Sequence, residues 1–292
     1  MTLYRITLRL CSPLATPLKG DTIWGHIAWG IANHEGDEGI GEFLSREKSG
    51  DPSLVVSSAF PTGMLCRPIP EPQERTKSGL SAEEYAKIKL NKKLKYLAAA
   101  DYVSGVAEMS GDEAGSFKAV PVLHNTIDRS SNAVLEGGLY MVQEEWAGTA
   151  DWDIYVLSSD PAERVQELCE WAFENGYGAD ASTGKGKILV KNSPEPVEAR
   201  KTGSVYMALG PFVKESNTII TDLRGDIFIR SGRLGGDFAS IVVPYKKTVL
   251  LYDAGAVFTS EKRLGYVGKI LPNVHMDPRI CQSAFTPVIP IA

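Results

Sequence analysis

The 292-residue sequence predicts an α+β fold made of two consecutive units. Residues before about 199 combine clear helix signals with strand-like segments, whereas the residues that follow carry strand signals and only weak helix signals. With 43% hydrophobic and 23% charged residues, the composition is typical of a globular protein with a buried core. The proline-containing stretch Pro194–Lys201 marks the expected boundary between residues 1–198 and 199–292.

The first unit begins with a strand, a turn and a helix. Residues Leu3–Leu10 alternate apolar and polar side chains, which is the pattern of a half-buried strand. A turn containing Lys19 and Gly20 follows, and Asp21 is expected to cap the apolar helix Ile23–His34. Because amides at the start of a helix attract anions, this turn is a candidate phosphate-binding site.

The rest of the first unit continues this alternation of helices and strands. A weaker helix is expected at Gly39–Lys48, and a stronger one after Pro161 has apolar side chains at helical spacing. That apolar stripe consists of Val165, Leu168, Cys169, Ala172 and Phe173. A short apolar segment lies at Leu54–Phe60, and strands are expected at Phe117–Leu123, Gly138–Glu144, Asp153–Leu157 and Lys187–Lys191. The order of elements is compatible with a ferredoxin-like sheet, although other topologies share the same periodicity.

An insertion at about residues 61–115 is expected to interrupt this unit. Pro61–Gly79 is rich in proline and charge, which is typical of a surface excursion. Ser81 and Glu84 form a capping box, which predicts a basic helix over Ala82–Ala100. Such a helix either presents a solvated face or follows a phosphate chain.

The second unit is predicted to be rich in short strands. They are expected at Ser204–Leu209, Asp226–Arg230, Thr248–Tyr252, Ala256–Phe258 and Ser283–Ile289. Helices in this unit, if present, are expected to be short.

Composition and charge argue against several classes of protein. The net charge of −5 argues against a nonspecific nucleic-acid binder, so any nucleic acid should be held at local basic sites. The four cysteines form no C-x-x-C pair, which makes a disulfide framework or a zinc site improbable. No apolar run is long enough for a membrane span and no signal peptide is evident, so we expect a cytoplasmic protein without membrane contact. The acidic segment 143–180 is a candidate protein interface.

A glycine- and lysine-rich loop, Ser182–Lys187, follows the second strong helix. The surrounding segment differs from a P-loop, because five residues separate Gly178 from Gly184 and because Gly186 stands where a Ser or Thr would reach magnesium. Its amides and lysines suit a phosphodiester backbone, while the alternative is a tight helix-to-strand turn.

RNA binding is the leading hypothesis from these loops. The candidate contacts are glycines, hydroxyl residues, an amide and cations in five segments of the chain. They are Lys19, Gly20, Asn125, Arg129, Ser182, Thr183, Gly184, Lys185, Gly186, Lys187, Arg224, Arg230, Arg233, Lys246 and Lys247. Arg129 is placed to pair with either phosphate or Asp128, and the cations of the second unit suit either RNA or an acidic partner surface.

No catalytic constellation, metal site or cofactor site is expected. The four histidines lack metal-ligand spacing. His26 lies within the apolar first helix, where a packing role is favoured over a role as acid or base in RNA cleavage.

An ordered set of motifs resembles a known family. The motifs are residues 12–26, 59–63, 124–129, 182–186, 244–248 and 282–290, and they span nearly the whole chain. In this order they resemble the family of fourth subunits of the type III-A CRISPR interference complex, the Csm complex, within the RAMP superfamily.

The resemblance implies two tandem ferredoxin-like (RRM-like) domains, the second of them degenerate. It further implies a noncatalytic subunit that holds the 5′ handle of the CRISPR RNA and joins the large polymerase-like subunit to the backbone RAMP subunit. The matching positions are the loop from Ser182 to Lys187 and the turn from Lys19 to Thr22. Two other functions are compatible with the residues: a metal-independent RAMP endoribonuclease that uses His26, and a protein adaptor that does not touch RNA.

Overall fold

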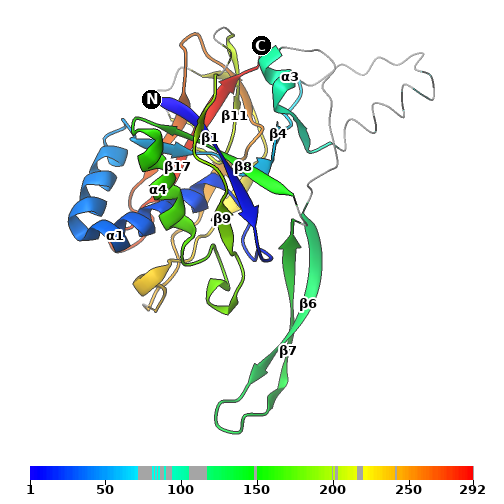
Figure 1. Cartoon of the computed structure of the whole chain (residues 1–292), viewed down its shortest axis with the longest axis vertical. Helices are drawn as coiled ribbons and strands as arrows, with labels where there is room; N and C mark the ends of the chain where they lie inside the picture. The colour runs from blue at the N-terminus through cyan, green and yellow to red at the C-terminus, as the bar shows by residue number, and fades with distance from the viewer. Residues whose placement is uncertain are drawn as a thin grey trace.

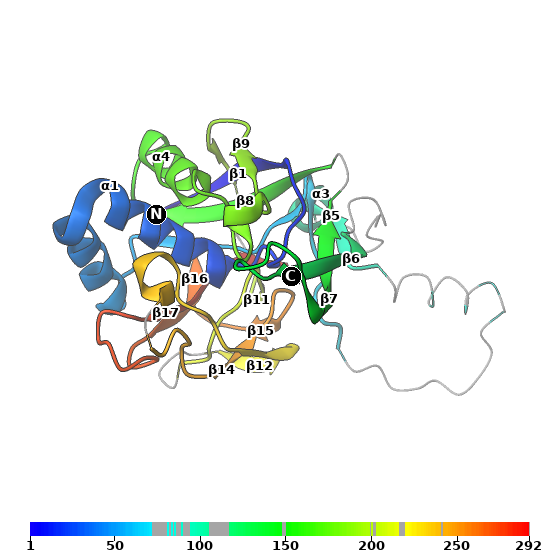
Figure 2. The ribbon, with the colours of Figure 1, turned by 90° about the horizontal axis from the view of Figure 1, so that it is seen from below.

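A computed structural model describes residues 1–71, 81, 83, 85, 89, 94–104, 117–147, 150–198, 200, 203–215, 220–240 and 242–291. Two helices, α1 (Gly20–Lys48) and α4 (Ala162–Phe173), lie side by side, and strands of the C-terminal unit lie against α1 on the side away from α4 (Figures 1 and 2). This mixture of many strands with few helices confirms the coarse fold class predicted from the sequence. Within the described ranges, no helix has the length and apolar character needed to cross a membrane.

The first sheet is antiparallel and contains six strands. They are β1 (Thr2–Leu10), β2 (Leu54–Val56), β3 (Phe60–Pro61), β8 (Asp151–Ser158), β9 (Ile188–Val190) and β10 (Glu195–Pro196). The main order is β10-β1-β8-β2, with β9 also paired to β1 and β3 to β8. Thus β1 and β8 form the centre, and Ile6 pairs with Ile154 in their register.

Helix α4 packs onto this sheet through the apolar stripe predicted from its sequence. All five stripe residues are buried, which confirms the helical spacing as the source of the contact. Helix α1 approaches α4 at Gly30, where an added Cβ would lie 2.7 Å from the Cβ of Trp171. A side chain at this position would therefore push the two helices apart.

Helix α1 has two parts, in agreement with the two separate helices predicted. Gly36 interrupts it with φ 71° and ψ −164°, a conformation that only glycine adopts readily. The predicted cap at Asp21 is wrong. The N-cap residue is Lys19, with no side-chain cap, and Asp21 is buried within the first turn, where it binds residues of the second unit.

The second sheet contains five antiparallel strands and no α-helix among the described residues. The strands are β11 (Val205–Ala208), β12 (Thr221–Arg224), β15 (Val257–Thr259), β16 (Tyr266–Leu271) and β17 (Gln282–Pro290). Their order is β12-β15-β11-β17-β16. A separate two-stranded ribbon pairs β13 (Ile227–Arg230) with β14 (Val249–Tyr252), and a short 3₁₀ helix spans Gly236–Ser240.

The largest core crosses the predicted domain boundary. Met207, Leu209 and Phe285 of the second unit belong to the same buried cluster as Ile6 and Leu54 of the first. Strand β17 is buried along its whole length, because it contacts α1, β2 and β8 as well as its own sheet. The two sheets are therefore packed against each other, whereas the division at residue 198 stays a prediction.

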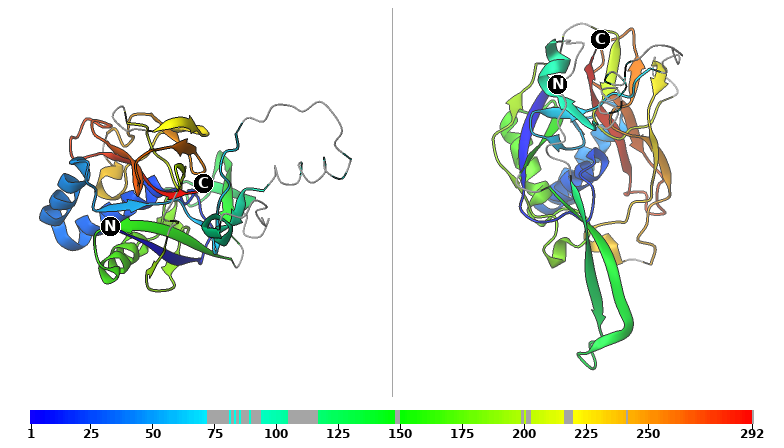
Figure 3. Two further views of the ribbon diagram at one scale, coloured as in Figure 1. Left: turned by 90° about the horizontal axis from the view of Figure 1, so that it is seen from above. Right: turned by 90° about the vertical axis from the view of Figure 1, so that its right-hand side faces the viewer.

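The segment between β3 and β8 forms structures outside both sheets. It contains β4 (Met64–Cys66), β5 (Tyr96–Ala98), the helix α3 (Ala99–Ser104), β6 (Lys118–Ile127) and β7 (Val134–Trp146). The strands expected near residues 117–123 and 138–144 are present, but they form an isolated hairpin that projects far from the body (Figures 1 and 3). The excursion thus extends beyond the predicted limit of residue 115.

The predicted basic helix Ala82–Ala100 is wrong at its C-terminal end. Residues Tyr96–Ala98 form β5, which pairs with β4, and the side chain of Leu97 is buried. Pairing with a distant strand and burial of Leu97 override the local helix preference. Most of the remaining helix, including Lys87, Lys92 and Lys93, lies outside the described residues.

A buried polar cluster ties the start of α1 to the second unit. The carboxylate of Asp21 accepts two hydrogen bonds from the Arg230 guanidinium, both at 2.7 Å, and one from the Gln282 amide at 3.1 Å. Asp21 is only 4% exposed, so these bonds replace the water that the carboxylate loses on folding. We call Asp21, Arg230 and Gln282 the inter-unit cluster.

We predict that Arg230→Ala destabilises the protein by about 2–4 kcal/mol, because it leaves a buried carboxylate without its cation. Arg233→Ala is the matched control: Arg233 is exposed, forms no ion pair with another described residue, and its loss should cost less than about 0.5 kcal/mol. Urea unfolding of the two variants measures the difference. Equal free energies of unfolding would show that the inter-unit cluster does not stabilise the fold.

Candidate nucleic-acid interface

The glycine-rich loop has a defined backbone rather than an extended one. Asp180 (φ 61°), Gly184 (φ 93°) and Gly186 (φ 67°) all adopt left-handed conformations, and the short 3₁₀ helix Ala181–Thr183 lies between the first two. Residues Ser182, Thr183 and Gly184 are exposed at its outer end. The loop therefore presents hydroxyl groups and backbone to solvent from a fixed position.

Three backbone contacts anchor this loop to the body. Gly186 N–H donates to Pro13 O, and Gly186 O accepts from Tyr177 N–H, both at 2.8 Å. The Lys187 N–H donates to the Ser12 hydroxyl at 2.8 Å. The close approach explains why residue 186 is glycine, since an added Cβ would lie 2.0 Å from the carbonyl oxygen of Tyr177. The loop and the residues before the first helix thus form one connected surface.

Lys185 points inward, although it was predicted as an RNA contact. It is 8% exposed, and its ammonium lies 2.8 Å from Glu144 Oε1 and 3.3 Å from Asp180 Oδ2. The hydrogen bond with Glu144 raises the pKa of Lys185, so the lysine stays charged at neutral pH. Because Glu144 belongs to β7, Lys185 connects the glycine-rich loop to the base of the hairpin.

Lys187 is the exposed cation of the loop. It has no ion-pair partner within the described part of the chain. A groove of about 510 Å³ runs beside it, between the end of α4 and β9, with Gly184 and Lys185 also in its wall. Lys187 is therefore available to an anion without loss of an internal contact.

The projecting hairpin carries two further predicted contacts. Asn125 is exposed on β6, and Arg129 is exposed in the turn between the strands. The Asp128 carboxylate accepts hydrogen bonds from the N–H and hydroxyl of Ser130, at 2.8 and 2.7 Å. Asp128 is thus engaged within the turn, and Arg129 forms no ion pair with it.

The base of the hairpin lies against the same surface as the glycine-rich loop. Leu14 and Glu145 exchange two backbone hydrogen bonds of 2.9 Å. Together with the ion pair of Lys185, these bonds hold the start of the hairpin beside residues 12–14. The structure thus brings the glycine-rich loop, the hairpin base and the residues before α1 together.

The predicted turn at Lys19 and Gly20 is engaged within the protein. The Lys19 ammonium lies 2.5 Å from Asp253 Oδ2 and 4.3 Å from the centre of the Phe228 ring. Gly20 is buried, and a Cβ there would lie 2.4 Å from Val56 O. Both residues hold the second unit or the neighbouring loop against α1.

Three of the predicted cations of the second unit are likewise engaged. Arg224 pairs with Glu71 at 2.8 Å, and Arg230 belongs to the inter-unit cluster. The Lys246 ammonium donates to Cys281 O and Gln282 Oε1, at 2.8 and 3.0 Å, and burial lowers its pKa. Arg233 and Lys247 are exposed and lack ion-pair partners among the described residues. The exposed candidates therefore fall into two groups, one at the glycine-rich loop and hairpin and one beside the β13–β14 ribbon.

His26 is held by backbone contacts on both sides of its ring. Its Nε2 accepts a 3.1 Å hydrogen bond from Gly178 N–H, and the backbone of Ala172 also bonds the ring. The ring packs on Tyr177 with centroids 4.8 Å apart, and burial lowers its pKa to about 4. Neutral and enclosed, His26 supports the start of the glycine-rich segment.

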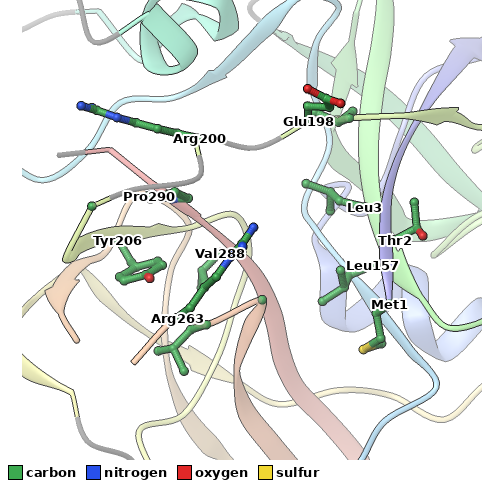
Figure 4. A pocket seen from close by; sticks show the side chains of 14 residues that line it. Met1, Thr2, Leu3, Leu157, Glu198, Arg200, Tyr206, Arg263, Val288 and Pro290 are labelled. Atoms are coloured by element: carbon green, nitrogen blue, oxygen red, sulfur yellow. The ribbon is translucent and has the colours of Figure 1, made fainter. Parts of the chain in front are cut away.

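A second cavity, of about 540 Å³, opens between the two sheets and contains none of the predicted contacts. Leu3 and Leu157 lie on its first-unit side, Tyr206 and Val288 lie opposite, and Arg263 reaches between them (Figure 4). No group of three or more potential metal-ligating side chains occurs in the described part of the chain.

Sequence reasoning missed the partners of the predicted cations. Glu144, Asp180 and Asp253 accept the ammonium groups of Lys185 and Lys19. Asp253 is more than 200 residues from Lys19, and Glu144 is about 40 residues from Lys185, so neither pair has a local spacing signal. Asp180 lies only five residues before Lys185, so a turn between them would have predicted this ion pair.

Comparison with known proteins supports the fold over its full length. No family model and no curated protein matches the sequence. A chain of the Csm1-Csm4 cassette in complex with cA4 matches with a TM-score of 0.61 and 14% identity, over 99% of this chain and 98% of that chain. The same cassette with pppApA gives 0.60 and 15%, with the same coverage. A chain of the Csm3-Csm4 subcomplex of the type III-A CRISPR-Cas interference complex gives 0.53 and 11%, over 98% and 99%.

These likenesses show that the whole chain has the fold of a chain found in Csm assemblies. The resemblance indicated by the ordered sequence motifs is thereby confirmed at the level of the fold.

We predict that Gly186→Ala strongly destabilises the protein, whereas Gly184→Ala costs only about 1–2 kcal/mol. Both glycines have positive φ, but a Cβ at 184 meets nothing within 4 Å and one at 186 meets Tyr177 O. Thermal unfolding of the two variants measures the difference. Similar losses for both variants would contradict the close approach at position 186.

We predict that His26 makes the protein sensitive to acid. Its folded pKa of about 4 lies below the ordinary value of 6.5, so its contribution to stability is present above pH 6.5 and is lost as the pH falls toward 4. In His26→Gln, the loss of stability between pH 7 and pH 4.5 should be smaller by about 1–3 kcal/mol. Urea unfolding of both proteins at the two pH values tests this, and equal losses would contradict it.

Proposed function

We propose that this chain is a noncatalytic RNA-binding subunit of a type III-A CRISPR effector complex. In this role it holds the 5′ handle of the CRISPR RNA and links the large polymerase-like subunit to the backbone RAMP subunit. The observation that carries the proposal is the surface formed by the glycine-rich loop, Lys187 and the hairpin base. The full-length fold likeness to chains of Csm assemblies supports the same assignment.

The proposed RNA contacts are the exposed candidates at the glycine-rich loop and along the hairpin. Ser182 offers its hydroxyl and Gly184 its backbone, whereas the Thr183 hydroxyl donates to Asp180 O and can only accept a further hydrogen bond. Lys187 offers an ammonium without an ion-pair partner among the described residues. Along the hairpin, Asn125 and Arg129 would extend this track toward the tip. A few local cations on a body of net charge −5 suit RNA held at one place rather than nonspecific binding.

The engaged cations take a positioning role in this proposal. Lys185 sets the glycine-rich loop against the hairpin, while Lys19 and Arg230 hold the second unit against α1. To bind a phosphate, each of the three would have to break its ion pair with a carboxylate of the protein. Breaking that ion pair costs more free energy than an exposed contact with a phosphate provides.

The sheet order supports a ferredoxin-like first domain. The spatial order β10-β1-β8-β2 places the fourth, first, third and second of these strands along the chain side by side. Helix α1 connects β1 to β2, and α4 connects β8 to β10. We propose that the second unit is a degenerate copy of this domain, in which strands remain and α-helices are lost.

A noncatalytic role fits the state of His26. A general acid or base needs a ring nitrogen that reaches the substrate, and backbone groups occupy this ring from both sides. We therefore assign the ring to packing rather than to RNA cleavage.

We predict that Lys187→Ala weakens binding of a handle RNA about 3- to 10-fold. Arg129→Ala should act in the same direction, and each loss should reduce the salt dependence of log K by about 0.7. Lys262→Ala is the control, because Lys262 is also exposed but lies in the second unit, outside the proposed surface. Fluorescence anisotropy with a labelled single-stranded handle measures the constants at several salt concentrations.

Two results would contradict the proposal. One is handle binding that Lys187→Ala and Arg129→Ala leave unchanged. The other is cleavage of repeat RNA by the purified protein in metal-free buffer that disappears in His26→Ala, which would establish the endoribonuclease instead.

A further inference from the structure

The β13–β14 ribbon exposes an aliphatic face. Ile227 is 57% exposed, Ile229 69% and Leu250 63%. Large aliphatic side chains exposed together on one surface, with a charged rim, are a common mark of a contact site.

The cross-strand register explains why these side chains gather on one side. Ile229 pairs with Leu250 and Ile227 with Tyr252, so these four residues share a face. The alternate pair, Phe228 with Leu251, points to the other face, where Leu251 is fully buried and Lys19 lies over Phe228. The ribbon thus uses one face to join the two units. Its other face is exposed at Ile227, Ile229 and Leu250, whereas Tyr252 at its end packs on Phe212.

The exposed apolar surface continues beyond the ribbon. An isolated bridge pairs Arg233 with Tyr245, which is 55% exposed. Next to it, Val243 O accepts a hydrogen bond from His275, and the adjacent Met276 is 78% exposed. The exposed surface is therefore aliphatic around Ile229 and Leu250, and it has both apolar and polar side chains at the end near Arg233 and Tyr245.

The charges at this rim are positive. Arg233 and Lys247 are exposed there and lack carboxylate partners among the described residues. Nearby, Asp277 is occupied by Arg279 at 2.6 Å. A surface that complements this end would carry carboxylates.

We propose that the outer face of the β13–β14 ribbon is a docking surface for another protein subunit. The partner surface it fits is aliphatic at its centre, opposite Ile227, Ile229 and Leu250, and acidic at one end, opposite Arg233 and Lys247. This inference rests on the proposed function, because it treats the chain as one subunit of a larger assembly.

The chemistry of the ribbon favours protein over RNA. Single-stranded RNA binds on flat aromatic rings flanked by cations, and the branched aliphatic side chains at the centre of this face offer no such ring. Tyr245, the exposed ring beside Arg233, lies at the rim rather than at the centre. Aliphatic side chains instead gain free energy by excluding water against an apolar protein surface. Arg233 and Lys247, predicted as RNA contacts or as contacts to an acidic partner, take the second role here.

The test uses the full chain with its two proposed neighbours, the purified large subunit and the purified backbone subunit, each measured separately by biolayer interferometry. We expect Ile229→Glu and Leu250→Glu to weaken one of the two complexes at least 10-fold. Ile229→Leu, which keeps the aliphatic face, should stay within 2-fold of the unaltered chain. Arg233→Glu should weaken the same complex, because it repels the expected carboxylates.

Handle RNA binding, measured in parallel, separates this inference from the proposed function. We expect Ile229→Glu to bind handle RNA as the unaltered chain does, and its urea unfolding midpoint to match that of the unaltered chain, because the site is exposed. If neither glutamate variant weakens either protein complex, or if Ile229→Glu weakens only RNA binding, the docking surface is refuted. Loss of RNA binding in Lys187→Ala bears on the proposed function alone.

Discussion

The fold depends on one desolvated carboxylate, Asp21 at the start of α1. A buried carboxylate is strongly unfavourable unless cations and donors replace its water, and both replacements here come from the second unit. Arg230 is the last residue of β13 and Gln282 is the first of β17, so their bonds with Asp21 place a ribbon and a sheet relative to the first helix. Because the largest core also continues from one unit into the other, the two sheets behave as one packed body.

The need to neutralise buried carboxylates determines which basic residues stay available for RNA. A lysine or arginine near a helix start is an attractive phosphate ligand only while it is free, and the protein uses Lys19, Lys185 and Arg230 to neutralise its own carboxylates. Among the predicted contacts that the structure describes, the cations without an ion-pair partner lie on different elements: Lys187 and Arg129 near the glycine-rich loop and along the hairpin, Arg233 and Lys247 beside the aliphatic ribbon. An acidic body can therefore offer one local surface to RNA and another to a protein.

The sequence predicts elements well where the signal is local. The apolar stripe of α4 and the alternation of β1 are recovered because helical and strand periodicity depend on nearby residues. Strands β12 and β16 are not predicted. Each contains a residue with positive φ, Asp222 in β12 and Gly268 in β16, and aspartate and glycine are residue types that strands disfavour. The hairpin strands are predicted, but not their separation from the sheet, because that depends on which strands pair. The candidate site is likewise predicted only where its signal is local. The glycine-rich loop can be recognised in the sequence, whereas Glu144 and Asp253, the distant partners of Lys185 and Lys19, cannot.

The central claim is that the glycine-rich loop and the hairpin hold the handle of the guide RNA in an assembled complex. The most direct measurement is photo-crosslinking of the reconstituted complex, with 4-thiouridine placed at each handle position and the crosslinked peptides identified by mass spectrometry. The account predicts crosslinks to residues 182–187 and 125–129, and none to the outer face of β13–β14. Handle crosslinks confined to other subunits, or to that ribbon, would contradict it.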